Sequence, residues 1–402
     1  MLGPRRAARR AWFVDPRVAL VRRLLQRIAV GRLTVTPPAG ERLVGEGAPG
    51  EEASLHLHRW RALTRVLAES DIGFARAMID GDCASPDPVA LLRLFDRNMA
   101  ALGGAGTSYG PARWLQRLAH GARANTRAGA SRNIMAHYDL GNPFFAAWLD
   151  PSMSYSSGVY TDDSESLEAA QARKLDRIVE LLGLSGAERA LEIGCGWGGL
   201  AARLAESGVA SLDALTISPA QAAHARELLE KRGLAERVAV ALKDYRDVEG
   251  AYDRIVSIEM CEAVGEKFLP LYFATLARAL KAGGRAVIQA ITISDARLPS
   301  YRASPDFIQR FVFPGGFLPS PTLLREQIAR AGLKLAHAET FGHSYALTLA
   351  EWRHRFHLNW PRLAALGYDA RFRRLWDYYL CYCEAGFRES TIDVGLYVLT
   401  PA

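Results

Sequence analysis

The chain lacks the run of ~18 or more apolar residues that a membrane-spanning helix needs. Its first ten residues are basic, but no uninterrupted apolar stretch follows them, so we expect no secretory signal. The sequence of 402 residues contains five cysteines, whose spacing fits neither a disulfide framework nor a zinc site. These absences predict a globular protein of the reducing cytoplasm with no bound metal.

Positive charge gathers at the start of the chain, although the formal net charge of the whole is only +7. Arginines and apolar residues alternate there at roughly helical spacing, at Arg5, Arg6, Arg9, Arg10, Arg17, Arg22, Arg23, Arg27 and Arg32 and at Trp12, Phe13, Val18, Leu20, Val21, Leu24, Leu25 and Ile28. A basic amphipathic helix suits an anionic membrane surface, where each cation contributes ~1 kcal/mol. Nucleic acid or a merely solvated helix face would explain the same pattern. Because no nucleic-acid-binding motif is present, we expect an anionic membrane surface as the partner.

Composition divides the chain into three parts. Residues 1–102 mix alternating strand patterns with helical stretches and predict a small α+β domain. Residues 103–131 are rich in Gly, Ala and Arg and predict a basic linker. Residues 132–402 alternate helix and strand patterns, with strands expected near 189–194, 211–217, 237–242, 252–258, 284–293, 334–340 and 391–400. This alternation predicts an α/β fold with a doubly wound, seven-stranded, mostly parallel sheet.

The most informative motif is Glu192-Ile-Gly-Cys-Gly-Trp-Gly-Gly199. It lies between a strand pattern and a helix pattern, where glycines let backbone amides approach a nucleotide-like ligand. The order acid-x-Gly-x-Gly-x-Gly favours S-adenosylmethionine (SAM), although dinucleotide-binding folds use similar turns. A dinucleotide enzyme would place an acid at the end of the next strand, where Thr216-Ile-Ser-Pro-Ala-Gln221 stands instead. The sequence therefore predicts the class I fold of SAM-dependent methyltransferases.

The ends of successive strands indicate the remaining SAM contacts, because ligands of open α/β sheets bind at the carboxyl ends of strands. The third expected strand ends in Lys243-Asp-Tyr-Arg246, where an acid can accept a hydrogen bond from the adenine amino group. The fourth ends in the segment 257–265, which we expect to face the substrate. The predicted SAM-binding residues are Tyr155, Ser156, Glu192, Gly194, Gly196, Trp197, Gly198, Thr216, Ser218, Gln221, Asp244, Tyr245 and Arg246.

Further motifs occur in a specific combination: Tyr138-Asp-Leu-Gly-Asn142, Tyr155-Ser156, Leu191-Glu-Ile-Gly-Cys-Gly-Trp-Gly198, Thr216-Ile-Ser-Pro-Ala-Gln221, Glu262-Ala-Val-Gly265, Phe311-Val-Phe-Pro-Gly-Gly316 and Tyr378-Tyr-Leu-Cys-Tyr-Cys-Glu-Ala-Gly-Phe-Arg388. Together they resemble the cyclopropane fatty acid synthases and related mycolic acid methyltransferases over most of the chain. Met78-Ile-Asp-Gly-Asp-Cys83 is similar to a pattern in the lipid-binding N-terminal domain of the phospholipid enzymes. The resemblance implies that SAM methylates the double bond of unsaturated phospholipid acyl chains, after which proton loss closes a cyclopropane ring.

The same resemblance implies that a bicarbonate ion removes the proton. The matched catalytic positions are Glu262 and Tyr345 as side-chain ligands, Ile291 as a backbone ligand, Cys383 as the catalytic-site cysteine, and Ser157 where the family often has cysteine. The usual bicarbonate histidine matches Gln289, which can donate a hydrogen bond but cannot carry positive charge. His343 is a candidate to supply that charge.

Several alternatives stay open at this point. With glutamine at position 289, the reaction could end in a methyl-branched or methylene product instead of a ring. A catalytically silent lipid-binding protein could also keep this fold. A nucleic-acid methyltransferase ranks low, because the sequence has neither an Asn/Asp-Pro-Pro-Tyr motif nor a Pro-Cys nucleophile. We expect a cytoplasmic enzyme, peripheral on the inner face of the membrane, and a homodimer is left open.

Overall fold

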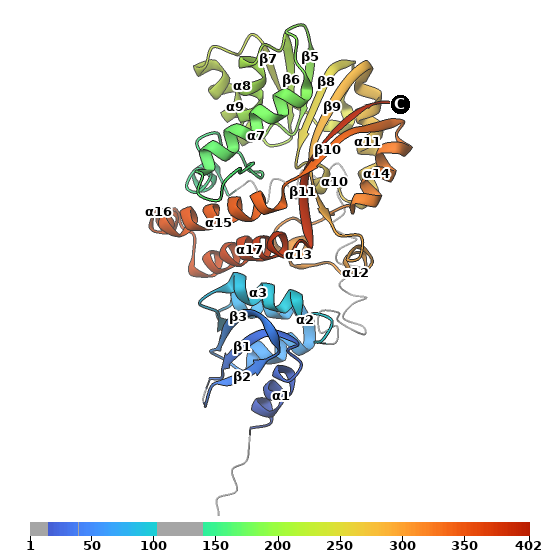
Figure 1. Ribbon diagram of the computed structural model, residues 1–402. Coiled ribbons are helices and arrows are strands. Elements are labelled where there is room, and N and C mark those ends of the chain that lie inside the picture. Colours follow the sequence, from blue (N-terminus) through green and yellow to red (C-terminus); the bar gives the residue numbers. More distant parts are fainter. Residues whose placement is uncertain (1–14, 39, 103–139) are drawn as a thin grey trace, which may run out of the picture. The chain divides into compact units, whose positions relative to one another are not determined.

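The computed structural model describes residues 15–38, 40–102 and 140–402, whose arrangement is drawn in Figure 1. The chain divides into two compact units, residues 1–106 and 107–402, and each has a hydrophobic core. The predicted linker over 103–131 lies outside the described residues, as do Trp12 and Phe13 of the basic segment. Within the described ranges, no helix combines the length and apolarity needed to cross a bilayer.

The N-terminal unit is an α+β structure built on a small sheet. Its elements are α1 (Pro16–Leu25), β1 (Val30–Thr36), β2 (Leu43–Glu46), β3 (Ala48–Leu57), α2 (Arg61–Ile79), β4 (Cys83–Ala84) and α3 (Pro88–Arg97). The strands lie in the order β2-β1-β3-β4, with β1 parallel to β3 and the other pairs antiparallel. The alternation that predicted strands near 33–36 and 53–58 is confirmed by β1 and β3, whereas β2 and β4 are too short to show a readable pattern.

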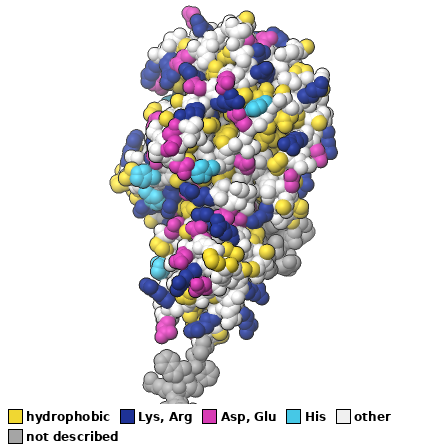
Figure 2. Space-filling model, in the orientation of Figure 1, with side chains coloured by type: hydrophobic (Ala, Val, Ile, Leu, Met, Phe, Trp, Pro, Cys, Tyr) yellow, Lys and Arg dark blue, Asp and Glu magenta, His cyan; other side chains and the backbone are white. Residues whose placement is uncertain are grey.

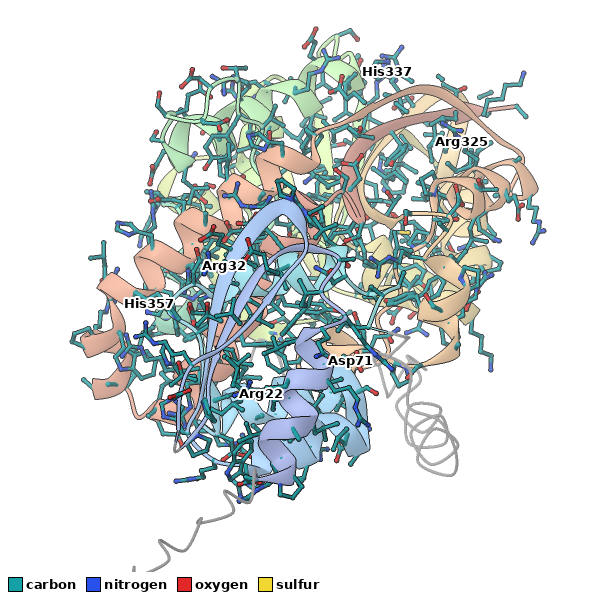
Figure 3. The ribbon with its side chains drawn as sticks, turned by 60° about the horizontal axis from the view of Figure 1, so that its bottom comes forward. Arg22, Arg32, Asp71, Arg325, His337 and His357 are labelled. Atoms are coloured by element: carbon teal, nitrogen blue, oxygen red, sulfur yellow. The ribbon has the colours of Figure 1, made fainter. Side chains whose placement is uncertain are left out.

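Helix α1 packs its apolar side into the core of its own unit. Val21 and Leu25 are 6% and 4% exposed and belong to the core of the N-terminal unit. Arg22 and Arg23 face solvent on the opposite side. Arg22 is labelled on α1 in Figure 3, as is the exposed Arg32 on β1. The exposed side of α1 is therefore basic rather than apolar.

The second unit contains the large sheet. Its elements are α6 (Asn142–Phe145), α7 (Leu167–Leu182), β5 (Arg189–Ile193), α8 (Gly199–Glu206), β6 (Ser211–Thr216), α9 (Pro219–Lys231), β7 (Val238–Leu242), η1 (Tyr245–Asp247), β8 (Tyr252–Ile258), α10 (Cys261–Val264), η2 (Glu266–Phe268), α11 (Leu269–Ala279), β9 (Leu280–Ile293), α12 (Leu298–Ala303), α13 (Phe307–Phe311), α14 (Pro321–Arg330), β10 (Leu333–Thr340), α15 (Gly342–Leu358), α16 (Trp360–Ala365), α17 (Ala370–Arg388) and β11 (Ile392–Pro401).

This sheet confirms the predicted fold class. Its strand order is β10-β11-β9-β8-β5-β6-β7; β11 is antiparallel to both of its neighbours, β10 and β9, and the other described pairs are parallel. Apolar side chains of α7, α8 and α9 form a core on one face, and those of α11 and α14 form a core on the other. Helices therefore cover both faces, as Figure 1 shows. The order reverses next to β5, which places its carboxyl end at the switch point where such sheets bind ligands.

Local sequence signals set the ends of the helices around this switch point. Ser218 caps α9 and Ser320 caps α14, and a proline at the first helical position follows each serine. Gly183 ends α7 with φ 61°, in the left-handed region that glycine adopts at little cost. Each of these three helix boundaries therefore carries a signal that is visible in the local sequence. Figure 2 shows Lys and Arg interspersed with Asp and Glu on the visible face, so the excess positive charge is not segregated there.

A cluster of aromatic rings holds α6 against α17. Phe144, Phe145 and Trp148 are fully buried, and each ring lies within 6.5 Å of the Trp376 ring. Trp148 also contacts Tyr155 at 5.4 Å between ring centroids. These three aromatic side chains are therefore core residues of this unit. The cluster fixes the segment that leads to the predicted SAM residue Tyr155.

Candidate active site

The glycine loop after β5 has the geometry of a nucleotide-binding turn. Gly194, Gly196 and Gly198 have φ values of 86°, 51° and 90°, which side-chain-bearing residues rarely adopt. The amide of Gly194 donates to the Leu215 carbonyl at 2.9 Å, which ties the loop to β6. A Cβ atom added to Gly196 would meet no described atom within 4 Å. The loop therefore leaves open space beside Gly196, where the sequence predicts the ligand.

Glu192, the acid of the motif, is buried at the carboxyl end of β5 with 3% exposure. Its Oε2 atom finds no hydrogen-bond partner among the described residues. Burial raises the pKa of Glu192 to about 8, although the charge of Lys174 opposes that rise. A buried acceptor without a partner costs free energy unless a ligand supplies a donor. Glu192 thus leaves a buried polar atom that a polar group of a ligand can satisfy.

The end of β6 forms a second part of the predicted SAM site. The Thr216 hydroxyl donates to Oε1 of Gln221 at 2.9 Å, and it accepts from the Ser218 amide at 3.2 Å. Ser218 in turn accepts from the Gln221 amide at 3.4 Å as the cap of α9. All three residues are buried and are brought together beside the glycine loop. Ser218 and Thr216 organise the turn. The side-chain nitrogen of Gln221, Nε2, stays available to a ligand.

The corner after β7 brings the predicted residues Asp244, Tyr245 and Arg246 together. Arg246 lies 2.6 Å from Oδ2 of Asp244, and its guanidinium carbon lies 5.5 Å from the centre of the Tyr245 ring. Arg246 therefore holds the Asp244 carboxylate in place at the corner where the sequence predicts the adenine amino group. The Lys243 amide donates to the Thr216 carbonyl at 3.0 Å, so this corner adjoins the end of β6.

Tyr155, Ser156 and Trp197 connect the loop to helices outside the sheet. The hydroxyls of Tyr155 and Tyr379 lie 2.9 Å apart, and Ser156 Oγ accepts from Lys174 Nζ at 2.8 Å. Trp197 is 3% exposed, and its indole nitrogen donates to Asn142 Oδ1 at 2.8 Å. The structure therefore places the predicted SAM residues in one connected region at the carboxyl ends of β5, β6 and β7.

The second centre lies at the carboxyl end of β8, and it differs from the prediction. Three donors matched to a bicarbonate site all bond to Glu259, a residue that the sequence did not single out. The Ser157 amide and Gln289 Nε2 donate to its Oε1 atom at 2.9 and 2.7 Å, and the Tyr345 hydroxyl donates to Oε2 at 2.6 Å. The predicted anion site is thus formed, but a carboxylate of the chain itself occupies it.

The remaining predicted ligands are also taken by the protein. The Ile291 amide donates to Oε1 of Glu262, whose Oε2 has no partner in the part of the chain that the structure describes. Burial, and then the nearby charge of Glu259, raise the pKa of Glu262 to about 8. Glu262 is therefore largely protonated at neutral pH. The sequence predicted that Glu262 and Tyr345 bind one bicarbonate ion together. In the structure, the Tyr345 hydroxyl donates its hydrogen bond to Glu259 instead.

Of the two remaining predicted positions, Cys383 lies near the centre and His343 lies outside it. Cys383 is partly exposed on α17, and burial followed by the charges of Asp306 and Glu259 raises the pKa of its thiol, so it remains protonated. This supports a place on the wall of the site rather than a nucleophile. His343 lies at the surface, 2.9 Å from Asp163, and 61% of its side chain is exposed. The expectation that His343 might replace the missing histidine charge is therefore wrong.

The two groups implied by the sequence fit this site differently. SAM fits, because an open glycine loop, an unpartnered buried acid and the Asp244 corner surround one region. Bicarbonate does not fit, because Glu259 and Glu262 accept the hydrogen bonds that it would need. Two neighbouring glutamates would also repel another anion whenever they are ionised. The described residues therefore leave no site for bicarbonate at this centre.

The doubly wound sheet and the glycine-loop site define the class of protein: this chain is a SAM-dependent methyltransferase. The family described as mycolic acid cyclopropane synthetase matches residues 125–396, about two thirds of the chain. The chain belongs to that family.

Named relatives cover different parts of the chain. The tuberculostearic acid methyltransferase UfaA1 of Mycobacterium tuberculosis is 37% identical over 95% of this chain and 91% of its own length. The cyclopropane-fatty-acyl-phospholipid synthase of Escherichia coli K12 is 40% identical over 64% of this chain and 65% of its own length. The crystal structure of mycolic acid cyclopropane synthase CmaA1 with SAH and CTAB aligns with TM-score 0.63 and 30% identity, over 67% of this chain and 97% of that one.

Proposed function

We propose that this enzyme transfers a methyl group from SAM to the double bond of an unsaturated acyl chain of a membrane phospholipid. We further propose that the product is a methylene-branched chain rather than a cyclopropane. The observation that carries this choice is the bonding of Tyr345, Ser157 and Gln289 to Glu259, which changes the site on which ring closure was expected to depend.

The first step needs close positioning, because an olefin is a weak nucleophile. SAM supplies the methyl group as an electrophilic sulfonium. The π pair of the double bond forms the new bond to the methyl carbon, and the electron pair of the broken S–CH3 bond stays on sulfur. Positive charge then appears on the neighbouring carbon of the acyl chain. The buried protein surroundings keep water from that cation until a base removes a proton.

The cyclopropane and the methylene-branched product differ in what happens to the cation before it loses a proton. If a methyl proton is removed at once, its C–H pair closes the ring onto the cationic carbon. If a hydride first moves from the methylated carbon to its neighbour, the same proton loss forms an exocyclic methylene group. A carboxylate held in three hydrogen bonds takes protons more slowly than a less restrained base, which gives the hydride time to move. UfaA1, the relative whose alignment covers 95% of this chain, is named for a methyl-branched acid, and this supports the same choice.

Analysis of lipids from a host that expresses this chain tests the proposal. We expect acyl chains heavier by one CH2 group, which disappear when SAM binding is abolished by a variant of the glycine loop. A cyclopropane and a methylene branch have equal mass, but only the methylene branch takes up hydrogen under mild conditions. Full resistance of the product to hydrogenation would replace our choice with cyclopropane synthesis, and absence of heavier chains would reject lipid methylation.

We also propose that the N-terminal unit binds anionic membrane through exposed arginines of α1 and the segment after it. Deleting residues 1–30 would remove Val21 and Leu25 from a core, so point changes are the cleaner test. Changing Arg22, Arg23 and Arg27 together to Gln should weaken binding to anionic vesicles at low salt by about 100-fold, since each cation contributes ~1 kcal/mol. The matched control changes the exposed Arg203, Arg232 and Arg330 of the catalytic unit to Gln. Equal loss of binding in both triple variants would contradict this proposal.

A further inference from the structure

We propose that Glu259 is the catalytic base of this enzyme, built into the chain at the place where the family resemblance implies a bicarbonate ion. This inference rests on the proposed methyl transfer to a double bond, and it names the group that removes the proton. The residues predicted as bicarbonate ligands become positioning residues for a carboxylate of the protein.

Counting lone pairs identifies the basic atom of Glu259. Its Oε1 atom accepts from the Ser157 amide at 2.9 Å and from Gln289 Nε2 at 2.7 Å, which uses both lone pairs. Its Oε2 atom accepts only from the Tyr345 hydroxyl, at 2.6 Å, among the hydrogen bonds of the described residues. One lone pair of Oε2 is therefore left to receive a proton. As a whole, Glu259 is half-buried rather than sealed in the core.

The backbone at Glu259 is held in an unusual conformation. Its φ of 48° lies in the left-handed region, which residues with a side chain rarely adopt. The Glu259 amide donates to the Gln289 carbonyl at 2.8 Å, which fixes this conformation at the end of β8. Strain of this kind is retained where the surrounding structure demands it, and it is frequent at functional sites. At Glu259 this strained backbone carries a side chain that accepts hydrogen bonds from three other segments of the chain.

The charged and titratable groups around Glu259 suit a base. They are Lys174 on α7, Glu262 on α10, Tyr345 on α15 and Cys383 on α17. Burial raises the pKa of Glu259, while its hydrogen bonds and the charge of Lys174 limit that rise, so the carboxylate is a base that its donors restrain. The Cys383 thiol stays protonated, so it does not compete for the proton. Because the pKa of Glu262 is raised to about 8, Glu262 adds little negative charge beside Glu259 at neutral pH.

The step balances without another reactant. After the hydride shift, the cation lies on the carbon that carries the new methyl group. A methyl C–H bond breaks, its electron pair becomes the π bond of the exocyclic methylene, and the proton moves to Oε2 of Glu259. The positive charge of the cation and the negative charge of the carboxylate are both neutralised. The protonated glutamic acid then returns its proton to solvent after the lipid leaves.

Removing the carboxylate tests this assignment. We expect Glu259→Gln to bind SAM normally by calorimetry but to lose about 100- to 10,000-fold in kcat, the usual contribution of a general base. Glu259→Gly relieves the positive φ and empties the anion site. We expect labelled bicarbonate to bind this variant by 13C line broadening, and added bicarbonate to restore part of its activity. Adding Gln289→His should strengthen that rescue, because imidazolium can pair with the anion.

Wild type should bind no labelled bicarbonate and should work equally well in carbon dioxide-free buffer. Its rate should fall as pH drops through the raised pKa of Glu259, since the base acts only when deprotonated. Glu266→Gln, at an exposed glutamate of η2, is the matched control and should behave as wild type. Full activity of Glu259→Gln, or dependence of wild type on bicarbonate, would overturn the assignment. Failure of wild type to methylate any unsaturated lipid would instead reject the proposed function, and the bicarbonate-binding readout would still decide whether Glu259 fills the anion site.

Discussion

Replacing Gly196 by valine is expected to raise the dissociation constant for SAM by about 100-fold or more in a protein that remains folded. Gly196 has φ 51°, and a side chain added there would meet no described protein atom within 4 Å. The side chain would therefore project into the open space beside the glycine loop, where the methyl donor must approach the backbone. Each tenfold loss of affinity corresponds to about 1.4 kcal/mol, which a direct steric clash readily exceeds. Isothermal titration calorimetry with SAM measures the effect.

The backbone strain of this substitution can be separated from its effect on the ligand. Gly233 ends α9 with φ 67°, and its added Cβ would likewise meet nothing within 4 Å among the described atoms. Gly233→Val should therefore cost similar stability, about 1–2 kcal/mol, without changing SAM affinity. If Gly196→Val bound SAM as well as Gly233→Val does, the glycine loop would not be the SAM site.

The second large effect is expected on stability. Trp148→Ala should lower the free energy of unfolding of the catalytic unit by about 3–5 kcal/mol, because removing a buried tryptophan leaves a cavity. The Trp148 ring is fully buried and lies within 6 Å of the rings of Phe144, Phe145, Tyr155, Trp352 and Trp376. SAM affinity should fall as well, because Tyr155 loses the ring that supports it. Urea unfolding followed by fluorescence measures the first effect.

An exposed apolar residue of the same unit provides the comparison. Leu358 at the end of α15 is 65% exposed, so Leu358→Ala should change the free energy of unfolding by no more than about 0.5 kcal/mol. A loss below about 1 kcal/mol in Trp148→Ala would show that the aromatic cluster does not hold α6 and α17 together as described.

The sequence predicted the catalytic fold well because its signals were local. Strand patterns, capping serines followed by proline, and Gly183 after α7 each act over a few residues. The SAM residues followed from a general rule, since the carboxyl ends of parallel strands meet at one edge of the sheet. The residues at the ends of β5, β6 and β7 accordingly lie together.

The sequence failed where the outcome depended on tertiary contacts. The segment after β8 contains two acids, Glu259 and Glu262, and no local pattern indicates which one meets Tyr345. That choice depends on the positive φ of Glu259 and on donors from loop, strand and helix segments up to 102 residues away in sequence. Likewise, alternation in α1 could not show that its apolar side was already buried within its own unit.

The fate of a labelled methyl group tests the central claim most directly. Purified enzyme should be given methyl-deuterated SAM and vesicles of an unsaturated phospholipid, and the product analysed by mass before and after mild hydrogenation. Removal of a methyl proton after a hydride shift predicts that the product keeps a CD2 group and takes up hydrogen. A product that keeps CD2 but resists hydrogenation would be a ring. A product that keeps CD3 would contradict the account, because the base would then have taken its proton from the acyl chain and not from the transferred methyl group.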